Sequence, residues 1–235
     1  MKKLFLVPTP ISDDTSGIPE QVIRILKSST HFICERVRTT RRFIRSIIKD
    51  FDIDAVTFIE LDKRGSIHQN QEIVECLKSG KDFCFMSEAG SPCIADPGSE
   101  LVNMARKNEY TIVPLSGPSS IILALMASGM NGQQFSFRGY LPVKKDALRK
   151  ELKHIEKGNL KTGYTQIFIE TPYRNAQMFA QICEVVNPSI RLHIALHIHS
   201  DQEHLVTKPI NKWISDNKMG KILNEKAPCI FILGK

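Results

Sequence analysis

The sequence predicts an α/β protein built from two α/β domains, and two observations support this fold class. Short apolar runs rich in β-branched and aromatic residues alternate with segments whose apolar residues recur at helical spacing. This alternation is typical of strand–helix–strand units that form a parallel sheet. The chain also has 235 residues, of which 42% are hydrophobic and 24% are charged, so each half can bury a core.

The first half is expected to contain strands joined by helices. The strands are predicted at residues 4–7, 31–34, 56–60, 82–86 and 111–115. The helices are predicted at residues 21–28, 39–50, 71–79 and 98–108. Asp96 and Pro97 suit the start of the last of these helices, as N-cap and first helical residue. Because ligands of parallel sheets gather beyond the carboxyl ends of the strands, we expect the functional residues in the loops that follow them.

The second half repeats the pattern with longer connections. We predict strands at residues 135–140, 166–170, 191–197 and 229–233. Helices are predicted at residues 119–130, 146–157, 175–186 and 210–217, and residues 157–165 are predicted to form a loop. We place the boundary between an N-terminal α/β domain, 1–116, and a C-terminal α/β domain, 117–235.

Composition and cysteine usage point to a cytoplasmic protein. No apolar run approaches the roughly twenty residues that span a bilayer, and the apolar run near the N-terminus is too short for a signal peptide. The six cysteines are scattered and form no C-x-x-C pair, as expected of reduced thiols. The net charge of +7 favours an anionic partner, although many proteins of similar charge bind none.

Common catalytic motifs are missing from the sequence. It contains no G-x-G-x-x-G after a strand, no phosphate-binding P-loop, no H-E-x-x-H and no G-x-S-x-G. Dehydrogenase, kinase and hydrolase functions therefore lose their usual support.

The most informative segment is residues 87–98, which join a predicted strand to a predicted helix. It is rich in turn formers and is longer than the roughly two to six residues that usually connect such elements. The alternative is a plain connection without a ligand, but its length and composition favour a functional loop. Residues 7–12 and 115–120 occupy the same position relative to two other strands, so the three loops are expected to converge.

These loops carry the motifs of a known family. The matching segments are Pro8-Thr9-Pro10-Ile11-Ser12, Glu35-Arg36-Val37-Arg38-Thr39-Thr40, the whole run 87–98, Gly117-Pro118-Ser119-Ser120, Phe137-Arg138-Gly139-Tyr140-Leu141-Pro142 and Glu170-Thr171-Pro172-Tyr173-Arg174. In this order they resemble the tetrapyrrole methylase superfamily of S-adenosylmethionine-dependent methyltransferases. Within it, they are most similar to the enzymes that methylate the ribose 2′-hydroxyl of a cytidine in small-subunit (16S) ribosomal RNA.

The resemblance implies a homodimer of two-domain subunits with S-adenosylmethionine in the cleft between the domains. RNA, as small-subunit rRNA or the ribosomal subunit, is the implied substrate. By similarity the cofactor contacts are Pro10, Glu88, Ala89, Gly90, Ser91, Ser119, Ser120, Ile169, Ala227 and Pro228. Such a pocket needs backbone polar groups and apolar walls, which small residues and prolines provide.

Two carboxylates are candidates for a catalytic base that would accept the proton of a ribose hydroxyl: Glu35 and Glu170. Each has an equally good structural alternative. Glu35 would pair with an adjacent arginine, and Glu170 would cap the turn at Pro172.

A basic segment follows Glu35, with five arginines within ten residues. Four of them share one helical face and are predicted to contact RNA phosphates: Arg38, Arg41, Arg42 and Arg45. The alternative is an ordinary solvated face, but the segment offers few acidic partners on the same helix. Such contacts would position RNA without reading its sequence.

Histidines gather at His193, His197, His199 and His204, with His197 and His199 predicted on the same side of a strand. We expect no metal site, because supporting cysteines and a clear carboxylate pattern are missing, and favour exposed positions or substrate contacts. Tyr140 and Tyr173 lie inside the matching motifs. Either stacking on a base or packing would explain them.

The sequence departs from the family pattern at several positions. Arg36 replaces an Asp, Ser12 replaces a Gly, and residues 196–200 replace Arg-Glu-Leu-Thr-Lys. The chain also ends soon after the last predicted strand, where many relatives continue. Two alternatives therefore stand beside RNA methylation: methylation of a tetrapyrrole or other small molecule, and a non-catalytic module that binds RNA or nucleotides.

Overall fold

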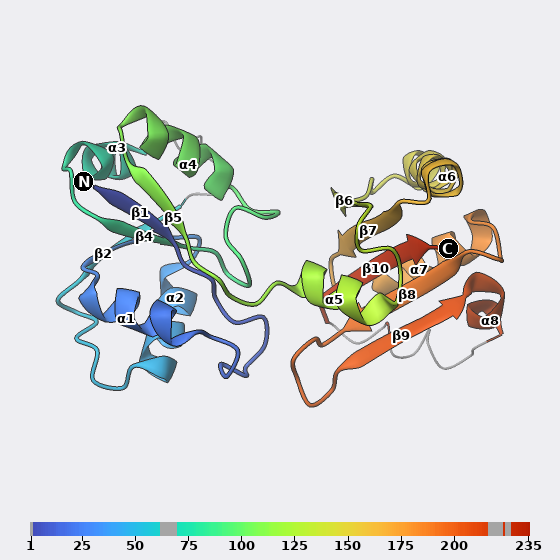
Figure 1. Cartoon of the computed structure of the whole chain (residues 1–235), viewed down its shortest axis with the longest axis horizontal. Helices are drawn as coiled ribbons and strands as arrows, with labels where there is room; N and C mark the ends of the chain where they lie inside the picture. The colour runs from blue at the N-terminus through green and yellow to red at the C-terminus, as the bar shows by residue number, and fades with distance from the viewer. Residues whose placement is uncertain (1, 62–69, 216–222, 224–226) are drawn as a thin grey trace. The chain divides into compact units, whose positions relative to one another are not determined.

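The computed structural model describes residues 2–61, 70–215, 223 and 227–235, and it divides into two compact units (Figure 1). The units are Met1–Ser119 and Ser120–Lys235. The observed division therefore falls slightly later than residue 116. Residue 118 is bonded within the first unit, where Ser91 Oγ donates to the Pro118 carbonyl at 3.2 Å.

The first unit is built on a parallel sheet, as predicted. Its strands are β1 (Lys3–Leu6), β2 (His31–Cys34), β3 (Thr57–Glu60), β4 (Phe83–Met86) and β5 (Thr111–Pro114). They lie in the order β3-β2-β4-β1-β5, and all pairings are parallel. The carboxyl ends of all these strands therefore lie at one edge of the sheet.

Helices cover both faces of this sheet (Figure 1). They are α1 (Glu20–Ser28), α2 (Val37–Ile47), α3 (Gln71–Lys78) and α4 (Gly98–Lys107). One cluster of buried residues joins the sheet to α1 and α2, and another joins it to α3 and α4. Every residue of the central strand β4 is buried, which explains why its sequence is continuously apolar instead of alternating.

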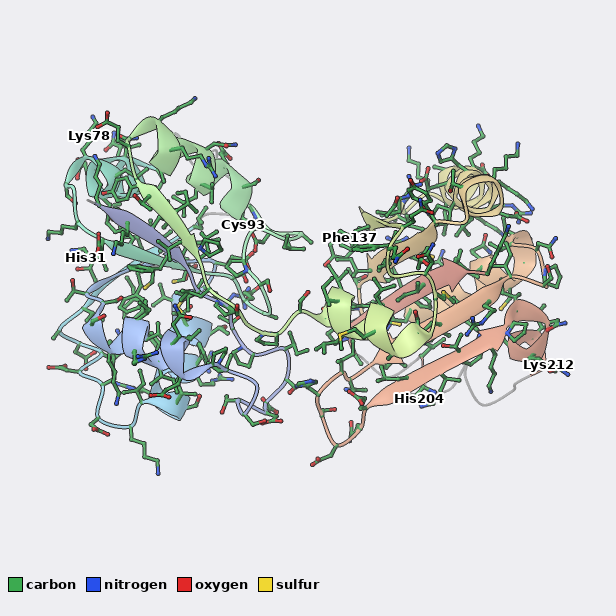
Figure 2. All side chains as sticks on the ribbon, in the orientation of Figure 1. His31, Lys78, Cys93, Phe137, His204 and Lys212 are labelled. Atoms are coloured by element: carbon green, nitrogen blue, oxygen red, sulfur yellow. The ribbon has the colours of Figure 1, made fainter. Side chains whose placement is uncertain are left out.

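The second unit has a mixed sheet. Its strands are β6 (Phe135–Tyr140), β7 (Thr165–Glu170), β8 (Arg191–Leu196), β9 (His204–Pro209) and β10 (Cys229–Gly234). They lie in the order β6-β7-β10-β8-β9; β6 and β7 are parallel, and the other pairings are antiparallel. Strand β9, which begins at His204 (Figure 2), was not predicted. It is a half-buried strand at the sheet edge and lacks a strong apolar alternation.

The helices of the second unit are α5 (Ser120–Ser128), α6 (Lys145–Thr162), α7 (Asn175–Val185) and α8 (Ile210–Ile214). The prediction of a loop at residues 157–165 was wrong over most of that range, because α6 continues to Thr162. Nothing in the described part of the chain forms a helix long and apolar enough to span a membrane.

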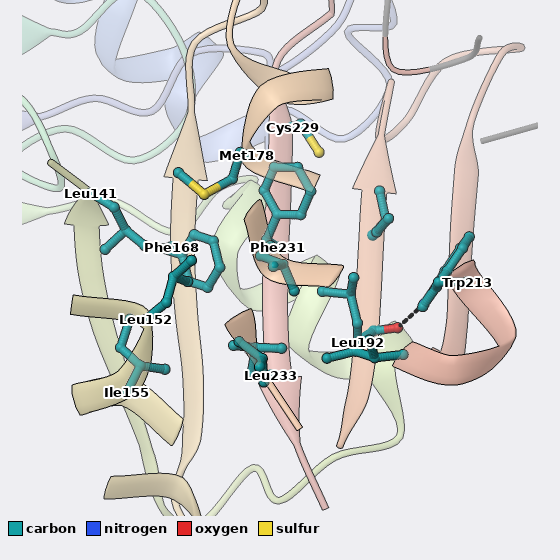
Figure 3. Packing of buried hydrophobic residues seen from close by; sticks show 14 of the residues in the cluster. Leu141, Leu152, Ile155, Phe168, Met178, Leu192, Trp213, Cys229, Phe231 and Leu233 are labelled. Atoms are coloured by element: carbon teal, nitrogen blue, oxygen red, sulfur yellow. Dashed lines mark hydrogen bonds between the residues drawn. The ribbon is translucent and has the colours of Figure 1, made fainter. Parts of the chain in front are cut away.

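Aromatic packing anchors the core of this unit (Figure 3). Phe168 of β7 stacks on Phe231 of β10 with ring centroids 5.7 Å apart. Trp213 of α8 is buried, and its indole N–H donates to the Leu192 carbonyl of β8 at 2.9 Å. That hydrogen bond satisfies the polar end of a large apolar side chain.

His193 of β8 is fully buried beside α5. The Thr207 hydroxyl donates to the Ser128 carbonyl at 3.0 Å, so the His193 Nδ1–H donates to Thr207 Oγ1, 2.8 Å away. The other ring nitrogen, Nε2, has no hydrogen-bond partner among the described residues. Protonating Nε2 would bury an unpaired charge, and burial together with nearby Arg191 lowers the pKa of His193 to about 4.

This histidine predicts an acid-sensitive fold. The unfolded chain binds its proton near pH 6.5, above the folded pKa of about 4. The free energy of unfolding should therefore be unaffected above pH 6.5 and should fall by about 3 kcal/mol between that pH and pH 4. Urea denaturation at several pH values measures the free energy of unfolding. His193→Gln should lose its decrease between pH 6.5 and pH 4, whereas His154→Gln, at an exposed position, should keep it. Equal slopes in wild type and His193→Gln would contradict the assignment.

Candidate functional site

The loops after β1 and β4 are joined by a pair of backbone hydrogen bonds. The Thr9 amide donates to the Gly90 carbonyl at 3.0 Å, and the Gly90 amide donates back to the Thr9 carbonyl at 3.1 Å. Thr9 is buried, and its hydroxyl donates to the Ser87 carbonyl at 3.3 Å. Two irregular segments are thereby held as if they were adjacent strands.

The loop after β5 reaches the same point. A side chain added at Gly90 would place its Cβ 3.4 Å from Ile11 Cγ2 and 3.6 Å from the Pro118 carbonyl oxygen. Ser91 Oγ donates to that Pro118 oxygen at 3.2 Å. Gly90 has a φ of +74°, a conformation that favours glycine. The three loops that were expected to converge therefore meet around Gly90, all within the first unit.

The second half of the long loop is held by Asp96. Its carboxylate accepts hydrogen bonds from the amides of Cys93, at 2.8 Å, and Gly98, at 2.7 Å. Helix α4 begins at Gly98 and Pro97 is its N-cap, so the predicted roles of Asp96 as N-cap and Pro97 as first helical residue were wrong by one position. Asp96 instead accepts the amide of Gly98 from the position before the N-cap. Cys93 (Figure 2) and Ala95 adopt positive φ angles of 69° and 63°. Burial, and to a smaller extent the negative charge of Asp96, raises the pKa of Cys93 to about 12.

Glu35, a predicted base, follows β2 and is buried. Its Oε2 accepts a hydrogen bond from the Glu88 amide at 2.7 Å, which ties the end of β2 to the long loop. The adjacent Arg36 pairs through Nε with Glu88 Oε1 at 3.2 Å. Position 36, where this sequence departs from the family pattern, is thus in contact with a predicted cofactor residue.

Glu170, the other predicted base, ends β7 and has a fully buried side chain. Its Oε1 accepts hydrogen bonds from the Thr171 amide at 2.6 Å and the Thr171 hydroxyl at 3.2 Å. Its Oε2 forms an ion pair with Arg174 Nη2 at 3.2 Å but no hydrogen bond among the described residues, and Arg174 Nη2 donates to the Pro142 carbonyl at 3.1 Å. These contacts match the turn-capping alternative and leave the catalytic role a prediction.

The other predicted cofactor residues lie at several places. Pro10 and Ser119 are half-buried in loops of the first unit, and Ser120 begins α5. In the second unit, Ile169 is half-buried near the end of β7 and pairs with Ile230 of β10. The neighbouring residue Cys229 pairs with Glu170. Ala227 is buried and Pro228 is exposed, directly before β10. The antiparallel pairing of β7 and β10 brings these residues to one edge of the second sheet.

Sequence reasoning missed two residues that hold these segments. Thr9 joins two loops in the first unit, and the buried Asn175 donates through Nδ2 to the Ala227 carbonyl at 2.7 Å in the second. Asn175 directly follows the matching motif that ends at Arg174, which was the available signal. Thr9 lies inside the matching segment Pro8–Ser12, which was the available signal for it.

The arginines lie on α2 opposite its buried face, which is formed by Thr40, Phe43 and Ile44. Arg41 is paired with Asp54 and lies over the Phe58 ring, 5.6 Å from its centroid. Arg45 lies 3.9 Å from Asp54 as well. The remaining two, Arg38 and Arg42, are exposed and form no ion pair within the described ranges.

The predicted placement of His197 and His199 on one strand was wrong. Strand β8 ends at Leu196, and both histidines adopt positive φ angles, 51° and 62°, in the turn before β9. His193 is buried instead of exposed. Among the described residues, no group of His, Cys, Asp and Glu is arranged to hold a metal ion.

The sequence matches one protein family over most of its length. The model of the family described as Tetrapyrrole (Corrin/Porphyrin) Methylases matches residues 3–212. The chain is 31% identical over 217 residues to Ribosomal RNA small subunit methyltransferase I of Vibrio cholerae serotype O1, covering 91% of this chain and 72% of that protein. It is 30% identical over 234 residues to the protein of the same name from Hydrogenobaculum sp., covering 99% and 96%.

Solved structures share the fold at low sequence identity. The methyltransferase CobJ superposes with a TM-score of 0.68 at 13% identity, covering 100% of this chain and 95% of that one. Uroporphyrin-III C-methyl transferase from Thermus thermophilus, complexed with S-adenyl homocysteine, gives 0.59 at 15% identity, covering 99% and 97%. The family match, the fold and the ordered motifs agree: the chain belongs to the tetrapyrrole methylase family and is an S-adenosylmethionine-dependent methyltransferase.

Proposed function

We propose that this methyltransferase acts on small-subunit ribosomal RNA, at the ribose 2′-hydroxyl of a cytidine. The substrate class is supported by relatives at about 30% identity that are named Ribosomal RNA small subunit methyltransferase I. The structural observation that carries the proposal is the meeting of three strand-end loops at Gly90, which fixes the segments with the family's motifs in one place. A homodimer in the cytoplasm follows from the resemblance and belongs to the same proposal.

The loops around Gly90 fit S-adenosylmethionine. Ala89, Gly90 and Ser91 have small side chains, so a ligand can approach the backbone closely. Glu88 is partly exposed and supplies a carboxylate at the same place. We assign cofactor contacts to these four residues together with Pro10 and Ser119; the contacts of Ser120, Ile169, Ala227 and Pro228 stay predictions for the second unit.

The bound cofactor supplies an electrophilic methyl group on its sulfonium sulfur. The protein contributes position: the loop exchanges backbone hydrogen bonds with Thr9, and its amides donate to the carboxylates of Glu35 and Asp96. A fixed loop lowers the entropic cost of aligning the acceptor oxygen with the methyl group, which is the main requirement of such a displacement. Glu35 and Glu170 remain the candidates to accept the hydroxyl proton, and both are already held by hydrogen bonds.

The proposal is tested by methyl transfer in vitro. Radiolabelled S-adenosylmethionine is incubated with the protein and small ribosomal subunits from cells that lack this gene, and the rRNA is digested to nucleosides. We expect the label in 2′-O-methylcytidine. Label in a base, or transfer only to a tetrapyrrole acceptor offered in parallel, would contradict the RNA assignment.

Gly90 should matter for cofactor affinity. Gly90→Ala forces a side chain into a left-handed conformation that costs about 1–2 kcal/mol, at the point where the three loops meet. We expect the Kd for S-adenosylhomocysteine, measured by calorimetry, to rise at least about fivefold. Gly80→Ala is the matched control, because Gly80 has a similar φ of +72° in a different loop and open space around it. Equal affinities in the two variants would show that the loops do not bind the cofactor.

The arginine face should matter for RNA and not for cofactor. Replacing Arg38 and Arg42 with Ala should weaken RNA binding and reduce the slope of log K against log salt by about 1 for each phosphate that the variant no longer binds. The control removes the same charge from α4, by Arg106→Ala and Lys107→Ala, at exposed positions. The face does not bind RNA if both double variants show the same salt dependence.

A further inference from the structure

Two exposed tyrosines lie on neighbouring loops of the second unit. Tyr140 ends β6 and is 58% exposed, and Tyr173, in the turn after β7, is 81% exposed. Tyr140 pairs with Ile169 of the parallel strand β7, so both chains leave the sheet at the same edge. The hydrogen bond from Arg174 to the Pro142 carbonyl, at 3.1 Å, then joins the loops next to the two tyrosines.

The backbone turns Tyr140 away from regular strand packing. The register of β6 and β7 shifts between Phe137 and Tyr140, and Gly139 inside this irregularity has a φ of +64°. A bulge of this kind re-aims the side chain that follows it. Neither tyrosine belongs to the hydrophobic core of the unit, so core packing does not account for either side chain.

The charges around the tyrosines suit a polyanion. Lys144 and Lys145 are exposed in the segment that follows Tyr140. The one carboxylate at the end of β7, Glu170, is fully buried and paired with Arg174, so it does not repel an approaching phosphate at the surface. Aromatic rings beside cations are the usual means of holding unpaired nucleotides.

We propose that Tyr140 and Tyr173 form a stacking platform for an unpaired base of the RNA substrate, with Lys144 and Lys145 contacting the adjacent phosphates. This inference rests on the proposed function and adds to it that the RNA is recognised as a single strand. Bases in a duplex are stacked on each other, whereas an unpaired base exposes a face to an aromatic side chain. A ribose in such a segment is also accessible to a methyl donor.

The test uses a short single-stranded RNA oligonucleotide containing cytidine and a duplex of the same length as probes. Tyr140→Ala and Tyr173→Ala should each raise the Kd for the single strand at least about fivefold, corresponding to about 1 kcal/mol per stacked base. Tyr140→Phe and Tyr173→Phe should retain wild-type affinity, because the ring is kept. The control is Tyr164→Ala, which removes a partly exposed tyrosine from the opposite end of β7.

Calorimetry with S-adenosylhomocysteine should give the wild-type Kd for every variant, which shows that each is folded. The platform is overturned if wild type does not bind the single strand, if the Ala variants bind it as Tyr164→Ala does, or if their affinity for the duplex falls equally. The methyl-transfer assay separates this from the proposed function. If RNA binding depends on the tyrosines but rRNA is not methylated, the platform is supported and the ribosomal assignment is wrong. If rRNA is methylated equally well by the tyrosine variants, the ribosomal assignment is supported and the platform is wrong.

Discussion

The reciprocal hydrogen bonds between Thr9 and Gly90 are the constraint on which the candidate site depends. They join the loops after two neighbouring parallel strands, and the positive φ of Gly90 lets the loop after β5 approach closely enough for Ser91 to bond Pro118. Because these are backbone bonds, they specify the path of the chain and leave the side chains free to vary. Gly117 strengthens the arrangement, since a Cβ there would come within 2.3 Å of two atoms of Pro8.

Three carboxylates, Glu35 and Asp96 in the first unit and Glu170 in the second, mainly bind backbone amides. Glu35 accepts the Glu88 amide, Asp96 accepts two amides of its own loop, and Glu170 accepts that of Thr171. A hydrogen bond from an amide to a carboxylate is stronger than one between neutral groups. Such bonds suit loop segments, whose backbone is not paired in a helix or a sheet. This use of acidic residues agrees with a reaction in which alignment supplies much of the acceleration and proton transfer a smaller part.

Local patterns predicted the fold well and the contacts of the site poorly. The strands of the parallel sheet and the loop 87–98 could be recognised because apolar runs and turn formers are properties of adjacent residues. The bond from Thr9 to Ser87 and that from Glu35 to Glu88 join positions 78 and 53 residues apart, and no local pattern encodes them. Strand β9 was missed for a different reason: it is a half-buried edge strand, so its sequence lacks the periodicity of a core element.

Cys93 gives the long loop a built-in chemical reporter. Its thiol is held protonated at neutral pH by burial and by the neighbouring Asp96 carboxylate, and only the thiolate reacts readily with alkylating reagents. Cys93 and Ala95 have positive φ angles, which are unfavourable for residues other than glycine. The hydrogen bonds from the Cys93 and Gly98 amides to Asp96 hold the loop in this conformation. Opening of the loop would remove both influences on this thiol, so the alkylation of Cys93, followed at this residue, is expected to rise when the loop opens.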